Sequence, residues 1–134
     1  MILVRNLLLT FCLALSINAD AQEIRNASGA LIGRWNGAEY RSASGSLVYR
    51  YSHIGELRDA SGRLLLRVRG DDIRDARGAL KGRIGRNGEV RNQSGVLLGR
   101  IQENGDVRDQ SGTLIGRARD VLPLLVAFVL FFND

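Results

Sequence analysis

The sequence predicts an all-β protein, a pseudo-symmetric ring of short β-hairpin repeats around an apolar C-terminal segment. Three observations predict this fold. A pattern of 16 or 17 residues recurs six times, turn residues recur about every eight residues, and one apolar run follows the last copy. With 134 residues, of which 45% are apolar and 25% charged, the chain is long enough for one domain with one core.

The first 21 residues resemble a secretory signal peptide. They contain a positive charge at Arg5, an apolar stretch, and a small-x-small cleavage site at residues 19–21. We therefore expect an exported protein, secreted or periplasmic, whose mature chain begins at Gln22. Because the one cysteine, Cys12, lies in this leader, the mature chain has no disulfide and must be stabilised by packing.

Residues 22–120 contain the six copies of the repeat. Each copy places an acidic residue, an apolar residue and an arginine before a turn, and a Leu-x-x-Arg segment follows that turn, which reads Leu-apolar-Gly-Arg in three of the six copies. Two arginines, nine residues apart, recur in every copy. The first column holds Arg25, Arg41, Arg58, Arg74, Arg91 and Arg108, and the second holds Arg34, Arg50, Arg67, Arg83, Arg100 and Arg117. We expect each copy to form one structural unit.

Each copy contains two turns of different chemistry. The first typically has Asn or Asp at its first position and Gly at its fourth, as in residues 26–29 and 92–95. This pattern predicts a type I turn followed by a left-handed glycine, which is the three-residue hairpin loop with a bulge. The second turn is Asn36-Gly37, Asn87-Gly88 or Asn104-Gly105, with Gly55 and Gly70 in the other copies. Asn-Gly predicts a two-residue type I′ turn, in which both residues have positive φ.

The strand after the first turn begins with a column of leucines, and we expect this leucine face to point inward. The next column contains Lys81, whose ammonium group needs water. Side chains alternate along a strand, so Leu97 and Gly99 would share the inner face. Glycines on that face would let a neighbouring backbone or an axial element approach closely, whereas Tyr49 and Leu66 take their place in two copies and should break the symmetry there.

Residues 121–134 form the apolar C-terminal segment, which we expect to be a core plug within the same domain. The twelve residues of its apolar run, Val121–Phe132, span about 18 Å as a helix, whereas a bilayer core is about 30 Å thick, so no transmembrane span is expected. A segment that is apolar on every side should be buried on every side. A helix capped by Asp120, with Pro123 in its first turn, is the preferred interpretation, and an extended strand is the alternative.

The repeated Gly-x-Leu-Ile-Gly-Arg units, the Asx-x-x-Gly turns and the closing Phe-rich run resemble the five-fold β-flower proteins, which are small exported bacterial proteins. The similarity covers almost the whole mature chain. It implies a pseudo-symmetric ring of hairpins around a C-terminal apolar segment, and it brings no catalytic residue. Six copies differ from the five of the family's name. Counting the hairpins that join successive copies gives five, with the first and last strands left to close the ring, so five-fold and six-fold symmetry both stay open.

The composition argues against most enzyme chemistry. The mature chain has one His, one Lys and no Cys, so we expect no catalytic, cofactor or metal site. His53 lies next to Ser52 and near Glu56, but side chains within one turn cannot form a catalytic triad with its oxyanion site. The tripeptide Arg69-Gly70-Asp71 is better explained by the turn that the repeat requires there.

The two arginine columns are the candidate anion-binding residues. Guanidinium groups arrayed by symmetry are able to hold phosphates, sulfates or uronates. The alternative is that cross-strand pairs with the acidic residues of each copy serve only register and solubility. Anionic polysaccharide or lipid headgroups at the cell envelope are the partners considered, and nucleic acid is disfavoured by export and by the scarcity of aromatic residues.

We therefore expect an exported, non-enzymatic structural or binding module. A small hydrolase that uses arginine and carboxylate residues, and a self-assembling envelope subunit, are the alternatives.

Overall fold

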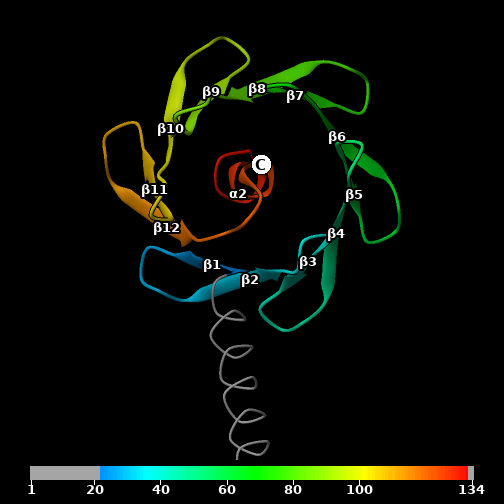
Figure 1. Ribbon diagram of the computed structural model, residues 1–134, viewed down its shortest axis with the longest axis horizontal. Helices are drawn as coiled ribbons and strands as arrows, with labels where there is room; N and C mark the ends of the chain where they lie inside the picture. The colour runs from blue at the N-terminus through cyan, green and yellow to red at the C-terminus, as the bar shows by residue number, and fades with distance from the viewer. Residues whose placement is uncertain (1–21, 133–134) are drawn as a thin grey trace, which may run out of the picture.

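A computed structural model describes residues 22–132, so the predicted signal peptide lies outside the described residues. Twelve antiparallel strands form a closed barrel (Figure 1), which confirms the predicted all-β ring of hairpins. Strands that are neighbours in the sequence are neighbours in the barrel. The first strand, β1 (Glu23–Asn26), pairs with the last, β12 (Leu114–Ala118), and this pairing closes the ring.

Six hairpins make up the ring, one for each copy of the repeat. The short strands of the copies are β1, β3 (Glu39–Ser42), β5 (Glu56–Asp59), β7 (Asp72–Asp75), β9 (Glu89–Asn92) and β11 (Asp106–Asp109). The longer strands are β2 (Leu31–Trp35), β4 (Leu47–Ser52), β6 (Leu64–Arg69), β8 (Leu80–Ile84), β10 (Leu97–Ile101) and β12. Five further turns join successive copies. The pseudo-symmetry is therefore six-fold, with the first and last strands closing the ring as the hairpin count suggested.

The first turn of each copy has the predicted geometry. In the first copy the amide of Asn26 donates to the carbonyl of Ala30 at 2.9 Å, and the amide of Gly29 donates back to the carbonyl of Asn26 at 3.0 Å. Gly29 has a φ of 90°, and the equivalent glycine of every copy also has positive φ. The Asn26 side chain accepts from the amide of Ala30 at 2.9 Å, so the Asx residue organises the turn.

The prediction of type I′ geometry at the second turn is wrong. Asn36, Asn87 and Asn104 all lack the positive φ that this turn requires. At Gly88 and Gly105 the loop has three residues and the glycine is its left-handed last residue. In these loops the Asn side chain instead accepts a backbone amide, as Asn104 does from Asp106 at 3.0 Å.

A β-bulge in every copy reverses the predicted orientation of the leucine column. Ile24 pairs with Gly33 but Arg25 pairs with Leu31, so one step along β1 matches two steps along β2. Side chains that pair directly lie on the same face, so Leu31 shares the outer face with Arg25. The bulged residue, Ile32, packs against the core. The inward leucine face is therefore a wrong prediction, because strict alternation does not continue through a bulge.

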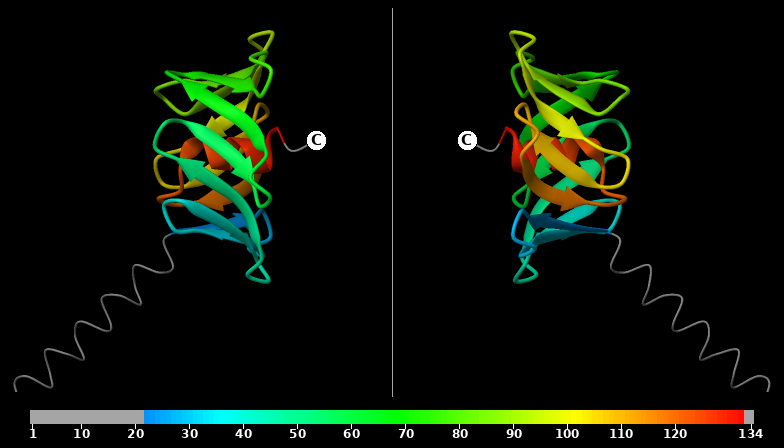
Figure 2. Two further views of the ribbon diagram at one scale, coloured as in Figure 1. Left: turned by 90° about the vertical axis from the view of Figure 1, so that its right-hand side faces the viewer. Right: turned by 90° about the vertical axis from the view of Figure 1, so that its left-hand side faces the viewer.

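The C-terminal segment forms helix α2 (Pro123–Leu130), which lies inside the barrel along its axis (Figures 1 and 2). This confirms the predicted helical plug and excludes the extended strand. Leu125 and Val126 are fully buried, as expected for a helix surrounded by strands. Pro123 lies in the first turn as predicted, but Leu122, with no side-chain cap, takes the N-cap position. The predicted cap by Asp120 is therefore wrong, because the helix begins too far along the chain for Asp120 to reach its first amides.

Helix α2 approaches the strands β8, β10 and β12, where the inner face carries glycine. A Cβ atom at Gly99 would lie 2.6 Å from Phe131 Cε1, and one at Gly82 would lie 2.6 Å from Phe132 Cζ. The nearest atoms to such a Cβ are the carbonyls of Arg108 and Arg91 on the neighbouring strands, so these glycines make room both for the neighbouring backbone and for the end of the plug.

Large side chains fill the space on the other side of the barrel. Tyr49 takes the place of a glycine, stacks on Tyr40 at 5.8 Å between ring centroids, and meets Phe128 edge-on at 5.2 Å. Leu66 takes the same place in the next copy and is 2% exposed. Burial, with a smaller contribution from Tyr49, raises the pKa of Tyr40 to about 12. The predicted break of symmetry in these two copies is confirmed.

The left-handed glycine of the first turn gives a testable prediction. Gly95 has a φ of 83° and open space around its Cα, so Gly95→Ala should destabilise the protein by about 1–2 kcal/mol through backbone strain alone. Thermal unfolding measures the change. Gly85→Ala is the matched control, because Gly85 does not have positive φ and an added Cβ atom would make only ordinary van der Waals contacts there. Equal stability of the two variants would contradict the strained turn.

The plug gives a second prediction. Leu125→Ala should destabilise the barrel by about 2–5 kcal/mol, because Leu125 is fully buried and the strands around it cannot collapse into the cavity. Val96, which is 56% exposed, offers the matched control Val96→Ala, with an expected change within about 0.5 kcal/mol. Chemical denaturation of both variants measures the difference, and a mild effect at Leu125 would mean that the plug is not needed for stability.

Candidate functional site

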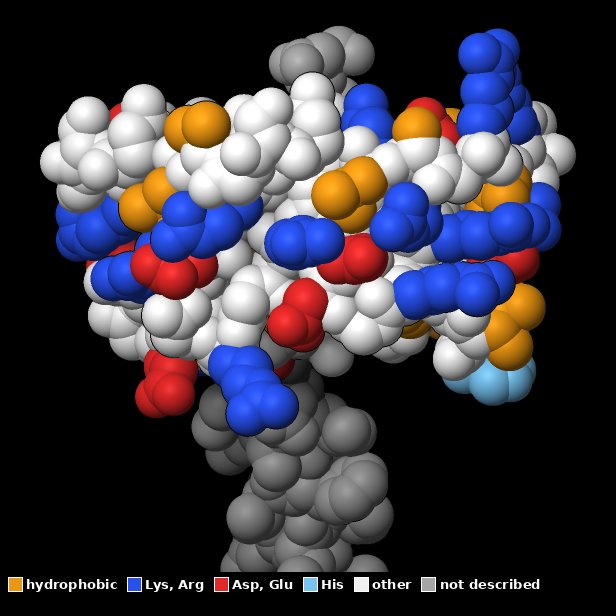
Figure 3. All heavy atoms as spheres, turned by 90° about the horizontal axis from the view of Figure 1, so that it is seen from above, with side chains coloured by type: hydrophobic (Ala, Val, Ile, Leu, Met, Phe, Trp, Pro, Cys, Tyr) orange, Lys and Arg blue, Asp and Glu red, His pale blue; other side chains and the backbone are white. Residues whose placement is uncertain are grey.

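The twelve arginines of the two columns lie on the outer wall of the barrel, where they form a belt with six carboxylates (Figure 3). We call the first column the turn arginines and the second column the wall arginines. The bridging carboxylates belong to Glu23, Glu39, Glu56, Asp72, Glu89 and Asp106. Together these eighteen side chains are the arginine belt.

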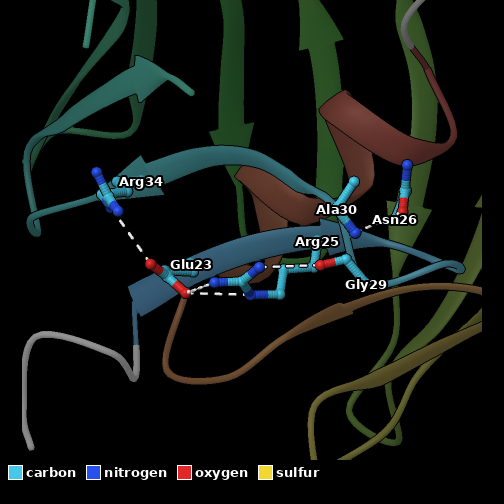
Figure 4. Close-up of polar contacts among 6 residues, drawn as sticks. All are labelled: Glu23, Arg25, Asn26, Gly29, Ala30 and Arg34. Atoms are coloured by element: carbon cyan, nitrogen blue, oxygen red, sulfur yellow. Dashed lines mark hydrogen bonds and ion pairs between the residues drawn. The ribbon is translucent and has the colours of Figure 1, made fainter. Parts of the chain in front are cut away.

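The first copy shows how the belt is built (Figure 4). Glu23 Oε1 accepts from Arg25 Nη2 at 2.7 Å, and Glu23 Oε2 accepts from Arg34 Nε at 3.3 Å. Arg25 also donates from Nη1 to the carbonyl of Gly29 at 2.9 Å, which fastens it to the turn. One carboxylate therefore links two neighbouring strands through two arginines, and the same arrangement recurs in all six copies.

The two columns differ in how firmly their side chains are held. Each turn arginine donates to the carbonyl of its turn glycine as well as to a carboxylate. Within residues 22–132, each wall arginine contacts its bridging carboxylate and donates no hydrogen bond to a turn carbonyl. The side chains of the turn arginines are also less exposed, at 38–46%, than those of the wall arginines, at 45–64%. The wall arginines therefore keep most of their N–H donors free for solvent or a ligand.

Arginines face arginines across the strands between copies. Arg34 pairs directly with Arg41, Arg100 pairs with Arg108, and the closing pair of strands brings Arg117 opposite Arg25. The remaining pairs are Arg50 with Arg58, Arg67 with Arg74, and Arg83 with Arg91. Like charges directly opposite each other destabilise a sheet, so the bridging carboxylates are needed to offset this repulsion.

The belt holds the whole net charge of residues 22–132. Its twelve arginines exceed its six carboxylates by six positive charges. Outside the belt, six basic and six acidic side chains of these residues cancel. The outer wall is therefore a positive band on a molecule that is otherwise neutral.

Two of the bridging carboxylates have lowered pKa values. A hydrogen bond from Arg25, opposed in part by desolvation, lowers the pKa of Glu23 below its ordinary 4.5. A hydrogen bond from Arg100 lowers the pKa of Glu89 below the same value. These carboxylates are therefore ionised at neutral pH and serve as counter-ions within the belt.

The other residues singled out in the sequence do not form a site. His53 is exposed at the tip of the turn between β4 and β5, while Glu56 is engaged by Arg58 and Arg67 instead. Gly70 and Asp71 form the two-residue loop between β6 and β7, where Gly70 has a φ of 59°. Both segments are thus accounted for by hairpin geometry.

Recesses occur at the two ends of the barrel, away from the belt. The largest group of charged side chains in them is Arg86, Glu103 and Asp120, near the start of α2, and no belt arginine lines any of these recesses. Among residues 22–132, no group of three or more His, Cys, Asp or Glu could hold a metal ion, and no helix there is long and apolar enough to cross a membrane. The arginines therefore encircle the wall and do not converge on one pocket.

No protein-family model matches the chain, and neither the curated proteins nor the solved structures give a significant match. The resemblance to the five-fold β-flower proteins therefore stays a prediction.

The lowered pKa values give a third prediction. A carboxyl group with a lower pKa in the folded state stabilises the protein above its ordinary pKa, and this stabilisation is lost as the pH falls through the folded value. Between pH 7 and about pH 3, the thermal midpoint of the wild type should therefore fall more than that of Glu89→Gln, which lacks the contacts at either pH. Glu103→Gln, outside the belt, is the control and should follow the wild type. If the thermal midpoint falls equally in all three proteins, the carboxylates of the belt do not contribute to the acid sensitivity of the fold.

Proposed function

We propose that the protein is an exported, non-enzymatic binding module that holds an anionic ligand of the cell envelope on its arginine belt. The observation that carries this proposal is the six-charge excess of the belt on an otherwise neutral surface. Carboxylate, sulfate and phosphate groups are the matching ligands, because a guanidinium group presents parallel N–H donors to two oxygens at once.

The facing arginine pairs favour ligand binding over a purely structural lattice. Every arginine of the belt contacts a carboxylate, but each carboxylate is shared by two arginines, so half of the positive charge of the belt has no counter-charge within it. An anion placed between Arg34 and Arg41 would offset their repulsion, so binding should also stabilise the fold. The exposed wall arginine supplies the free donors for that anion.

Binding to a heparin column tests the proposal. A triple variant of wall arginines, Arg67→Gln, Arg83→Gln and Arg100→Gln, should bind at least about tenfold more weakly than the wild type, because it loses donors in the belt. The matched control is Arg63→Gln, Arg77→Gln and Arg86→Gln, which removes the same charge from exposed residues outside the belt.

The control should retain most of the wild-type affinity and elution salt. If the two triple variants weaken binding equally, then net charge alone explains binding and the belt is a structural lattice.

A further inference from the structure

The belt is a closed circuit around the wall of the barrel. Each facing pair of arginines is followed, two strands further on, by the pair of the next copy, and the pairing of Arg117 with Arg25 completes the circle. Strands in a sheet are about 4.8 Å apart, so the facing pairs recur about every 10 Å along the backbone of the ring and further apart at the guanidinium groups outside it. A bridging carboxylate occupies the wall between successive pairs.

Each facing pair is by itself a weak site. Both arginines are exposed, and each already forms an ion pair with a carboxylate. Solvent and salt screen their charges, so a single small anion gains little binding free energy from one pair. Strong binding therefore requires several pairs to be engaged by one ligand, which raises the effective concentration at every pair after the first.

We infer that the ligand is a linear acidic polysaccharide that wraps around the belt and contacts several copies at once. This inference rests on the proposed function and names its ligand. A chain of alternating charged and neutral sugars places its anionic groups at intervals, so its charges can meet the arginine pairs while its neutral units pass the bridging carboxylates. A chain with a charge on every sugar, as in heparin, would place part of its charge against those carboxylates and would gain less binding per charge.

The shape of the belt disfavours a membrane surface. The arginines point outward from a convex wall (Figure 3), so a flat bilayer that touches one side leaves the other sides unused. The barrel ends are the parts that could rest on a plane, and the recesses there are lined by none of the belt arginines. A flexible chain follows a convex wall, whereas a plane does not.

The absence of aromatic side chains from the wall disfavours single-stranded nucleic acid. All aromatic residues among residues 22–132 belong to the core or pack against it: Trp35, Tyr40, Tyr49, Tyr51, Phe128, Phe131 and Phe132. Proteins that bind single strands stack bases on exposed aromatic rings, and the described wall offers no such ring. Recognition therefore depends on charge spacing.

Hyaluronan oligosaccharides, which alternate uronate and neutral sugars, test the inference by titration with the mature protein. Affinity should rise steeply with length and level off once a chain can encircle the wall, a path longer than the circumference of the twelve-strand backbone ring, which is about 60 Å. Free glucuronate and vesicles of phosphatidylglycerol should bind at least about a hundredfold more weakly than the longest chain.

A pair of variants separates wrapping from binding on one side. Arg83→Gln with Arg100→Gln removes two adjacent wall arginines and leaves four wall arginines intact. A wrapped chain loses two of its six contacts, so affinity for long hyaluronan should fall at least about tenfold. A ligand that uses only one side can bind elsewhere on the ring, and its affinity should fall less than about twofold. Arg77→Gln with Arg86→Gln is the charge-matched control, and circular dichroism checks that all variants fold.

The outcomes distinguish this inference from the proposed function. If glucuronate binds as tightly as long chains, or if the adjacent double variant loses less than twofold, the wrapped polysaccharide is wrong while anion binding by the belt stands. Preferential binding to vesicles would replace the polysaccharide with a lipid surface. If no anionic probe binds above the level of the charge-matched controls, both the inference and the proposed function fail.

Discussion

The space enclosed by twelve strands is the constraint on which the rest of the structure depends. Eight strands already form a barrel whose lumen side chains can fill, so a ring of twelve short strands needs additional atoms inside it. Helix α2 supplies them, and this explains why the C-terminal segment is apolar on every side and has no charged face. Without the helix, the inward glycines at Gly82, Gly99 and Gly116 would border an empty lumen.

A single helix cannot match the six-fold symmetry of the ring around it. It approaches β8, β10 and β12, where glycines give it room, and leaves a gap on the other side that Tyr40, Tyr49 and Leu66 fill. The repeats therefore differ on their inner face. Their outer face does not touch the helix, and there the carboxylate and both arginines are retained in all six copies.

The arginine belt combines a structural and an electrostatic role. Each carboxylate ties two strands together and reduces the repulsion between arginines that face each other, while each turn arginine also closes its turn. The same arrangement leaves six positive charges uncompensated and the wall arginines exposed. Under the proposed function, the turn arginines are already held in place before an anionic ligand arrives, which lowers the entropic cost of binding.

The sequence by itself determined the features that depend on short-range chemistry: the six copies, the Asx-x-x-Gly turns, and an apolar C-terminal segment that has to be buried. Each follows from residue types a few positions apart. The sequence favoured a helix over a strand for that segment, and it left open whether the arginines pair with carboxylates or bind a ligand. Only the tertiary structure decided what depends on pairing between strands. The bulge at Ile32 turned Leu31 outward, because two residues of one strand oppose one of the next. Strand register also placed Arg34 opposite Arg41, and the start of α2 at Pro123 left Asp120 outside its cap, since neither position is encoded in a local pattern.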